Sequence, residues 1–438
     1  MPDTTQNNQS DFIIEKMKER PVNKKKLLRR TVITAAMAVI FGLIACFTFL
    51  VLEPVFSNWL YPEKEPQVVV FPEESDEMAP EDMLVEEEDN LHDAVESVML
   101  EDEQIQKILD SINLDKNNYA QLYASMKMYV AELSKSMVVV TSMESDVDWL
   151  NDTYESEGST YGIILADNGS EYLILTDYNT IKKAESITVT LFDESKVQAE
   201  IKQTDTETGL AVIAVPYTDL SEETRQNVAV ATLGTSNMKN PVGVPVVALG
   251  CPMGMVGSVQ YGMISAAGYQ LSKVDANYRL LTTDIYGSSA STGVLFNMQG
   301  QVIGIITPLR AGADMKNSVT AIGISDLRKL VENMTNGKKT AYLGITGIDV
   351  TEEANTELDV PMGAYVKKVE MNSPAMLAGI QRGDVIVNID GYEIASFTEY
   401  TSTLRQLRVG KEVVVTIQRS VQGSYRNMEV ITTLEAAK

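Results

Sequence analysis

The longest apolar run of the chain lies near its amino terminus. The 22 residues from Thr31 to Leu52 carry no charge, and apolar residues fall on every helical face. At about 1.5 Å of rise per residue, such a helix spans about 33 Å, enough to cross the hydrocarbon core of a bilayer. The pattern therefore predicts one transmembrane helix over residues 31–52. A cleaved signal peptide is the alternative, but the run exceeds a usual signal core and no small-x-small cleavage motif follows it.

Charges on the two sides of this run predict its orientation. Residues 1–30 form a basic tail with eight Lys and Arg side chains, whereas Glu53, Glu63 and Glu65 follow the run. Basic flanks stay on the cytoplasmic side of a membrane. We therefore expect a single-pass protein of the cell membrane, with a cytoplasmic amino terminus and extracytoplasmic carboxyl-terminal domains.

Residues 53–115 are expected to form an acidic juxtamembrane linker. No Lys or Arg occurs between Glu65 and Gln106, and Pro72 and Pro80 interrupt the segment. Self-repulsion and prolines predict an extended, solvated spacer. A site for cations or for a basic partner is the alternative, although the spacing shows no calcium-binding loop.

Two stretches have apolar residues at helical spacing. One starts near His92 and continues to Ile112 within the linker, and the other runs from Tyr119 to Leu133. Both follow the i, i+3, i+4 pattern of an amphipathic helix. We expect them to be packing helices rather than parts of a ligand site.

From Met137 the pattern changes to short β-rich runs separated by Gly, Asn, Asp and Ser turns. Many short strands at such intervals are typical of an all-β sandwich or barrel. With the helix at its start, this domain covers residues 116–335, a length that suits a double barrel. A polar hinge over 336–341 follows, and a last unit occupies residues 341–438. The fold class is therefore expected to be mainly β.

Composition narrows the functional classes. The chain has 61 acidic and 36 basic residues, a formal net charge of -25, which repels phosphate backbones and argues against nucleic-acid binding. Cys46 lies in the apolar run and Cys251 lies far outside it, so we expect no disulfide between them. No metal cluster, phosphate loop or cofactor motif occurs, and we expect no cofactor. The single histidine is His92.

Two sets of motifs carry a resemblance to known families. In the β-rich region these are GSTYGII (158–164), YLILTDYNTI (172–181), TGLAV (208–212), VGVPVVALGCPMG (242–254), GMISA (262–266) and GQVIGIIT (300–307). In the last unit they are YLGI (342–345), SPA (373–375), AGI (378–380), GDVI (383–386) and NIDG (388–391). The first set resembles HtrA-like trypsin-fold serine proteases, and the second resembles a PDZ domain. The resemblance implies a trypsin-like double β-barrel followed by an α+β PDZ domain.

The resemblance also assigns the positions of a catalytic triad. Asn179 stands at the position of the histidine base, Gly209 at that of the aspartate, and Ser291 at that of the nucleophile. A serine hydroxyl is a weak nucleophile that needs an adjacent base, and neither an amide nor a glycine supplies one. His92 precedes the barrels and is expected to be a solvated residue at a helix start.

The turn around the nucleophile position departs from the family as well. Ser289 and Thr292 replace glycines on either side of Ser291. The backbone amides of this turn form the oxyanion hole in the family, and side chains at these places disfavour the turn that is needed. We therefore predict a pseudoprotease, which keeps the scaffold without hydrolysis. The alternative is an active endopeptidase of envelope protein quality control that uses Ser291 with an unrecognised base.

The PDZ resemblance implies a peptide-binding site. Its carboxylate-binding loop consists of Tyr342, Leu343, Gly344 and Ile345. Such a loop caps a terminal carboxylate while the peptide adds as a strand, so the expected partners are exposed carboxyl termini or unfolded polypeptide segments. The family resemblance further implies a homotrimer. A purely structural envelope protein is the third hypothesis.

Overall fold

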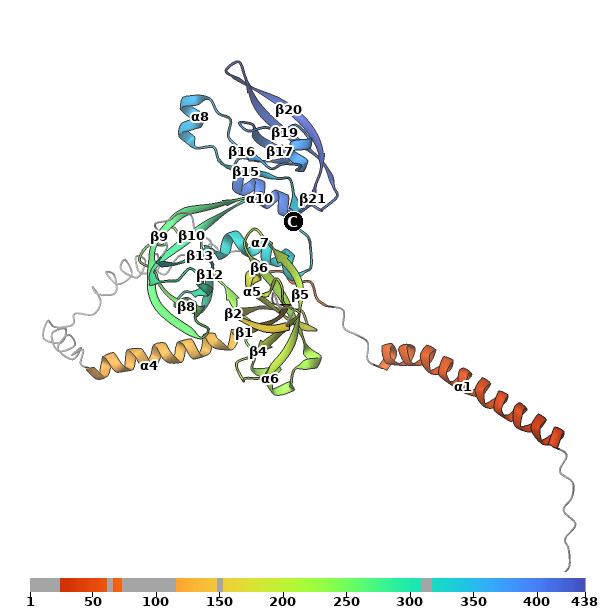
Figure 1. The fold of residues 1–438 in the computed structure, drawn as a ribbon. Coiled ribbons are helices and arrows are strands. Elements are labelled where there is room, and N and C mark those ends of the chain that lie inside the picture. Colours follow the sequence, from red (N-terminus) through yellow and green to blue (C-terminus); the bar gives the residue numbers. More distant parts are fainter. Residues whose placement is uncertain (1–23, 61–65, 73–115, 148–152, 309–316, 438) are drawn as a thin grey trace, which may run out of the picture. The chain divides into compact units, whose positions relative to one another are not determined.

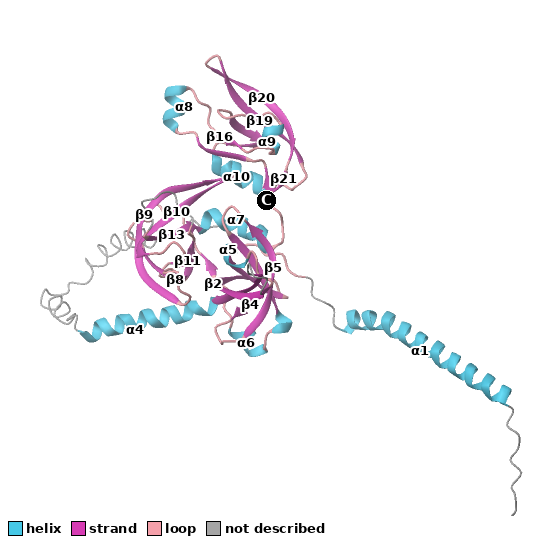
Figure 2. Cartoon of the chain, viewed as in Figure 1, coloured by secondary structure: helices cyan, strands magenta, loops and turns pink. Residues whose placement is uncertain are grey.

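The computed structural model describes residues 24–60, 66–72, 116–147, 153–308 and 317–437 (Figure 1). The chain divides into two compact units, residues 1–65 and residues 66–438. The described part of the first unit is helical, whereas strands predominate in the second (Figure 2). The prediction of a helix from about His92 to Ile112, and His92 itself, fall outside the described residues.

The first unit contains helix α1 (Lys24–Leu60). Within it, Leu28–Thr48 is long and apolar enough to cross a membrane, and this stretch overlaps the predicted segment 31–52. Two threonines in the stretch bond to their own helix: the hydroxyl of Thr34 donates to the Arg30 carbonyl at 2.8 Å, and that of Thr48 to the Ile44 carbonyl at 2.6 Å. Such i−4 bonds satisfy polar side chains that have no water to bond to.

The second unit begins its strands with a closed antiparallel barrel in the order β1-β2-β3-β6-β5-β4. Its interior is apolar and includes Val140, Ile174 and Ile213, none of which is exposed to solvent. Two short helices, α5 (Tyr178–Ile181) and α6 (Glu222–Asn227), follow β3 and β6. The strands are β1 (Met137–Val147), β2 (Thr153–Asp167), β3 (Glu171–Asp177), β4 (Ser186–Thr190), β5 (Lys196–Asp205) and β6 (Leu210–Pro216).

A second barrel follows in the chain. Its strands are paired in the order β11-β8-β9-β10-β13-β12, and the pairing of β11 with β12 closes the circle, while β7 (Thr232–Leu233) adds to β12 in parallel. The prediction of a double barrel is therefore confirmed. The strands are β8 (Pro245–Cys251), β9 (Ser258–Lys273), β10 (Ala276–Tyr286), β11 (Thr292–Phe296), β12 (Gln301–Ile306) and β13 (Ser318–Gly323).

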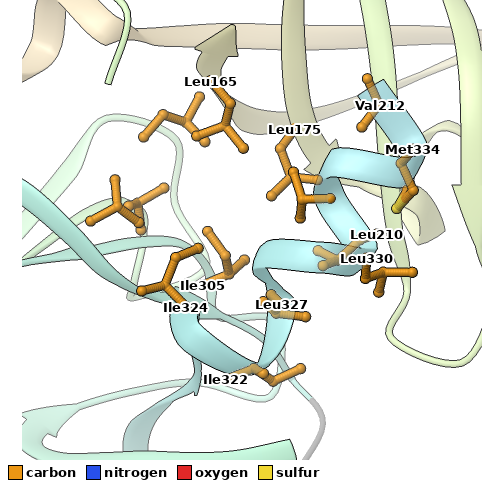
Figure 3. Close-up of a cluster of buried hydrophobic side chains, with 14 of the residues drawn as sticks. Leu165, Leu175, Leu210, Val212, Ile305, Ile322, Ile324, Leu327, Leu330 and Met334 are labelled. Carbon is orange, nitrogen blue, oxygen red and sulfur yellow. The ribbon is translucent and has the colours of Figure 1, made fainter. Parts of the chain in front are cut away.

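One apolar core joins the two barrels to helix α7 (Ile324–Thr335). Figure 3 shows side chains from both barrels converging on this helix. Leu327 and Val331 of α7 are fully buried in it. Because α7 contributes one apolar face to this shared core, it helps to hold the barrels together and so sets the position of the residues at their junction.

The last unit, predicted as residues 341–438, has the strands and helices of a PDZ domain. Its main sheet has the order β15-β16-β17-β19-β20, and helix α10 packs on a core that includes Phe397 and Tyr400. The strands are β14 (Ala341–Tyr342), β15 (Ile345–Asp349), β16 (Ala364–Val369), β17 (Val385–Ile389), β18 (Tyr392–Glu393), β19 (Glu412–Val421), β20 (Ser424–Thr433) and β21 (Glu435–Ala436). The helices are α8 (Glu352–Leu358), α9 (Pro374–Leu377) and α10 (Phe397–Gln406).

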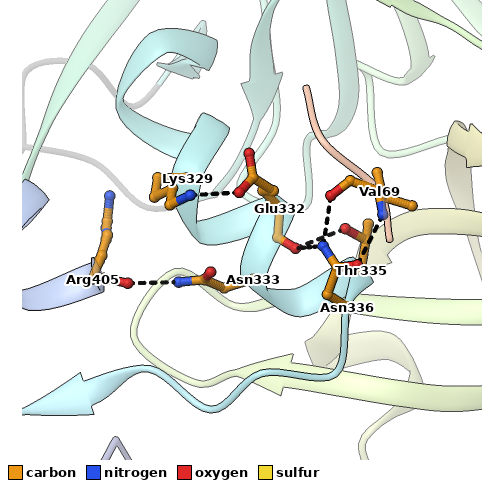
Figure 4. Close-up of polar contacts among 7 residues, drawn as sticks. All are labelled: Val69, Lys329, Glu332, Asn333, Thr335, Asn336 and Arg405. Atoms are coloured by element: carbon orange, nitrogen blue, oxygen red, sulfur yellow. Dashed lines mark hydrogen bonds and ion pairs between the residues drawn. The ribbon is translucent and has the colours of Figure 1, made fainter. Parts of the chain in front are cut away.

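Part of the predicted linker belongs to the folded unit instead. Val69 and Phe71 are buried in the core shared by the barrels and α7. Asn336, just after α7, holds Val69 through two bonds: its Oδ1 accepts the Val69 amide at 2.9 Å, and its Nδ2 donates to the Val69 carbonyl at 2.7 Å (Figure 4). The prediction of a solvated spacer over all of 53–115 is therefore wrong for residues 66–72, because two apolar side chains and the side chain of Asn336 bind this stretch to the barrels.

The second predicted helix is present as α4 (Lys116–Leu133). Its carboxyl-terminal end packs on the barrels: Leu133 is buried, Tyr129 and Val130 contact the shared core, and the Tyr129 hydroxyl donates to the Asn297 carbonyl. The expectation of a packing helix holds for this end. Tyr119 at the other end is 63 % exposed.

Candidate functional site

Asn179 and Gly209 lie close together, where β3 ends and β6 begins. Asp177 closes β3 and caps α5, accepting the Thr180 amide at 2.9 Å. Asn179 donates its side-chain nitrogen to Asp177 at 3.4 Å. The Gly209 carbonyl accepts the Tyr178 amide at 2.8 Å, and a Cβ built on Gly209 would lie 3.0 Å from the Asn179 side-chain nitrogen. The structure thus brings these two predicted positions together, one carrying an amide and the other no side chain.

Ser291 is engaged elsewhere. Only 1 % of its surface is exposed, and its hydroxyl lies 2.6 Å from the Pro252 carbonyl and 2.9 Å from the Ser288 carbonyl. The hydroxyl oxygen also accepts the Ser288 amide at 2.8 Å. A serine hydroxyl has one hydrogen to donate, and in this turn backbone carbonyl oxygens accept that hydrogen bond. The described residues give no hydrogen bond between Ser291 and Asn179.

The backbone amides of the same turn bond within the turn. The Ser291 amide donates to the Ser288 carbonyl at 3.3 Å, and the Ala290 amide donates to the Ser288 hydroxyl at 3.2 Å. The Thr292 hydroxyl lies 3.2 Å from that of Thr160 in the first barrel. An oxyanion hole needs amides that point at the developing negative charge. In this turn, the amides of Ser288, Ala290 and Ser291 already have acceptors inside the protein.

A small cavity lies at the junction of the barrels beside these positions. Asp177, Gly209 and Thr292 line it, together with apolar residues of both barrels, but Ser291 does not. Within the described residues, no group of three His, Cys, Asp or Glu side chains is arranged to hold a metal ion. The lining of this cavity contains one carboxylate, that of Asp177, and no imidazole.

Cys251 is the other nucleophilic side chain near this junction. It is buried, and burial raises the pKa of its thiol above the ordinary value, with the Asp177 charge adding to the rise and a hydrogen bond to Thr292 opposing it. Because the thiolate is the reactive form, a raised pKa keeps this thiol inert near neutral pH. Cys251 is therefore a small buried side chain rather than a reactive thiol.

Thiol labelling tests that statement. In the full chain carrying Cys46→Ser, which leaves Cys251 as the one cysteine, a disulfide reagent such as DTNB is expected to react slowly with the native protein and at once with the protein unfolded in urea. The native rate should still be rising with pH above the pKa of an ordinary thiol. Rapid labelling of the native protein at pH 7 would contradict a buried, protonated thiol.

The loop that is predicted to bind a peptide carboxylate bonds to a carboxylate of its own chain. The amides of Leu343 and Gly344 donate to Oδ2 of Asp275, both at 2.8 Å, and the Ile345 amide donates to Oδ1 at 2.9 Å. Asp275 lies in the turn between β9 and β10 of the second barrel. All three predicted loop amides therefore converge on one side chain, and Tyr342 precedes them in β14.

A fourth donor completes the surroundings of this carboxylate. The Tyr400 hydroxyl, from α10, donates to Oδ1 of Asp275 at 2.5 Å. Burial raises the pKa of Asp275 above its ordinary value, and the three loop amides and Tyr400 oppose that rise. Burial and the Asp275 charge raise the pKa of Tyr400 well above its ordinary value, so its hydroxyl stays protonated and able to donate.

Gly344 is the residue that permits this loop. Its φ is +92°, and a Cβ built there would lie 2.3 Å from the Ser373 Cβ. A side chain would therefore clash and would also disfavour the left-handed backbone. The absence of a side chain lets three successive amides face the same carboxylate, as in backbone anion nests.

Comparisons with known proteins agree with the fold and the order of domains. Residues 160–305 match the model of a trypsin-like peptidase domain, and residues 341–432 match that of a PDZ domain. The chain is 30 % identical over 279 residues to HhoB of Synechocystis sp., named as a serine protease, covering 60 % of this chain and 64 % of HhoB. It is 29 % identical over 278 residues to the serine protease Do-like HtrB of Bacillus subtilis, covering 59 % of each.

This chain is HtrA-like, with a trypsin-like domain followed by a PDZ domain. It spans less than two thirds of the length of either of those relatives. The HtrA-type protease AlgW, solved with a decapeptide, has 22 % identity and a TM-score of 0.51, covering 70 % of this chain and 98 % of AlgW. AlgW solved with a tripeptide gives 24 % identity and a TM-score of 0.50 over 71 % of this chain and 97 % of AlgW. At these identities the likeness shows the fold alone.

The sequence of the HtrA-like chain does not reveal Asp275 or Tyr400 as site residues. Asp275 sits between two strand patterns, where an aspartate is typical of a hairpin turn. Its φ of +58° fits that role. The loop residues that it binds lie 68 to 70 positions further along the chain, and Tyr400 lies 125 positions further. The one signal in the sequence is a carboxylate in a hairpin turn, and it does not indicate which residues that carboxylate binds.

Proposed function

We propose that this HtrA-like chain is a catalytically inactive relative of serine peptidases that binds exposed carboxyl termini or unfolded segments of other polypeptides. One observation carries the first half of the proposal: the Ser291 hydroxyl is buried and lies within hydrogen-bonding distance of the Pro252 and Ser288 carbonyls. A nucleophile in that state has neither a base to take its proton nor access to a substrate.

The chemistry around Ser291 supports this reading. Loss of the base from a serine triad costs about a million-fold in turnover. Asn179 offers an amide that does not accept a proton near neutral pH, and Gly209 offers no carboxylate to orient a base. Asp177 is the nearby acid, and its carboxylate is already used to cap α5.

The PDZ domain supports the second half. PDZ domains bind a peptide by strand addition and hold its terminal carboxylate in a loop of backbone amides. The bonds of the Leu343, Gly344 and Ile345 amides to the Asp275 carboxylate support such a role for this loop. AlgW, which has a similar fold, was solved with peptides.

The proposed setting is the outer side of a membrane. Helix α1 supplies a stretch that could span a bilayer, and the basic residues before it favour a cytoplasmic amino terminus. A DegP-like relative from Pseudomonas putida, 31 % identical over 290 residues, is named as periplasmic. The homotrimer stays a prediction that rests on family resemblance.

Activity measurements on the full chain in detergent test the proposal. We expect no covalent labelling by a fluorophosphonate probe and no casein hydrolysis beyond that of the Ser291→Ala variant, because the hydroxyl is not activated. A catalytically competent trypsin-fold protease, assayed in the same detergent, is the positive control. Labelling or cleavage that depends on Ser291 would overturn the proposal and establish the second candidate.

That second candidate is an active endopeptidase of envelope protein quality control. The names of the relatives favour it, since HhoB and HtrB are both named as serine proteases. It requires the turn at Ser288 to open and a base to approach Ser291. A structural envelope protein, the third hypothesis, would bind no peptide from a library of free carboxyl termini.

A further inference from the structure

We infer that Asp275 is an internal ligand of the PDZ domain, and that a carboxyl-terminal peptide binds the loop at Leu343, Gly344 and Ile345 only by displacing it. This inference rests on the peptide-binding half of the proposed function and concerns its regulation. The observation behind it is that a side-chain carboxylate from the second barrel accepts all three loop amides.

Asp275 also covers the free edge of β15, to which a peptide strand would add. β15 pairs with β16 on one side. On its other side the Ile345 carbonyl accepts the Asp275 amide at 2.7 Å, and the Gly347 carbonyl accepts the Asn277 side chain at 3.1 Å. Carbonyls at alternate positions of an edge strand are the acceptors that an added peptide strand uses. The hairpin tip therefore takes up both the carboxylate loop and this edge.

Helix α10, on the other side of the expected peptide-binding groove from β15, also binds Asp275. From α10, the Tyr400 hydroxyl donates to the Asp275 carboxylate, and the Thr401 hydroxyl donates to the Asp275 carbonyl at 3.1 Å. Residues of β15 and α10 thus bind Asp275 from two sides, and Asp275 is 8 % exposed. A peptide carboxylate has no path to the loop amides while this residue is in place.

Further bonds keep the hairpin and the PDZ domain together. Arg405, at the end of α10, donates to the Tyr278 hydroxyl of β10 and to the Asp326 carbonyl of α7, both at 2.8 Å. Its own carbonyl accepts the Asn333 side chain at 3.1 Å (Figure 4). A tethered ligand held in this way acts at an effective concentration on the order of millimolar or more. A free peptide then meets a competent loop in only a small fraction of molecules, and its apparent affinity falls by that fraction.

Asp275→Asn is the variant that separates the carboxylate from the turn. Asparagine has nearly the same size and also tolerates the left-handed φ of a hairpin turn, but it replaces one carboxylate oxygen by an amide nitrogen that cannot accept the loop amides. Asp275→Ala is the second variant, which removes both side-chain oxygens that accept the loop amides. Asp284→Asn is the matched control, because Asp284 lies on β10, the strand that follows Asp275, and accepts the Met263 amide of β9.

Two measurements on the full chain in detergent test the inference. First, hydrogen exchange of the segment that contains Leu343, Gly344 and Ile345 is expected to be at least about tenfold faster in Asp275→Asn and Asp275→Ala than in the unaltered chain and in Asp284→Asn. Second, a fluorescent decapeptide with a free carboxyl-terminal valine is expected to bind the Asp275 variants about tenfold or more tightly than the unaltered chain. The same decapeptide with an amidated end should gain nothing.

The outcomes distinguish this inference from the proposed function. Unchanged exchange in both Asp275 variants overturns the internal ligand, as does equal affinity of the free-acid peptide for the unaltered chain and the variants. Faster exchange in the variants without binding of that peptide or of any library of free carboxyl termini supports the internal ligand and sinks peptide binding as the function.

Discussion

Replacing Arg419 by methionine is expected to destabilise the PDZ domain by about 3–5 kcal/mol. Asp384 is 1 % exposed, and Arg419 neutralises it through two bonds of 2.7 Å, one from Nε and one from Nη2. The same guanidinium donates to the Gly379 carbonyl at 2.8 Å. Methionine keeps the apolar stem but leaves a buried carboxylate unpaired, which is the costly half of breaking a buried ion pair.

Hydrogen exchange of the β17 and β19 amides in the full chain measures the free energy of opening of this domain. Lys368→Ala is the control, because its pair with Glu370 has the same length, 2.7 Å, but the lysine side chain is 66 % exposed. Its loss should cost less than about 1 kcal/mol. A cost below that figure for Arg419→Met as well would mean that the buried pair contributes no more than an exposed one.

Leu327→Ala is expected to lower the stability of the double barrel by about 2–5 kcal/mol. Leu327 is fully buried on α7, at the point where side chains of both barrels meet it (Figure 3). Truncation leaves a cavity between three elements that cannot all close on it at once. Urea denaturation of the full chain in detergent, followed by circular dichroism, measures the effect.

Leu122→Ala makes the same chemical change on α4, where the side chain is 55 % exposed. It should alter stability by less than about 0.5 kcal/mol. If the two variants unfolded at the same urea concentration, the core shared by α7 and the barrels would not be what holds the double barrel together.

Local sequence patterns predicted the strands of the β-rich region, and the family resemblance implied the trypsin-like double barrel and the PDZ domain. Short β-rich runs and turn residues predict strands because each run buries its own side chains, and motif order adds the fold. The resemblance also assigned Asn179 and Gly209 to one site, and the structure brings them together where β3 ends and β6 begins.

What the sequence could not supply depends on contacts between distant residues. The orientation of the Ser291 hydroxyl is decided by the Pro252 carbonyl, 39 residues away, and the occupant of the PDZ loop by Asp275, 68 residues away. Val69 was assigned to a solvated linker because it stands beside an acidic run, whereas its bonds are to Asn336, 267 residues further on. No periodicity or propensity encodes such pairings.

The burial of Val69 and Phe71 changes the expected role of the acidic segment as a spacer. Residues 66–72 and the carboxyl-terminal end of α4 both pack on the barrels, so the described stretches on either side of residues 73–115 belong to the same folded unit. Cleavage of the chain between residues 73 and 115 would therefore leave residues 66–72 held on the barrels by two apolar side chains and one asparagine.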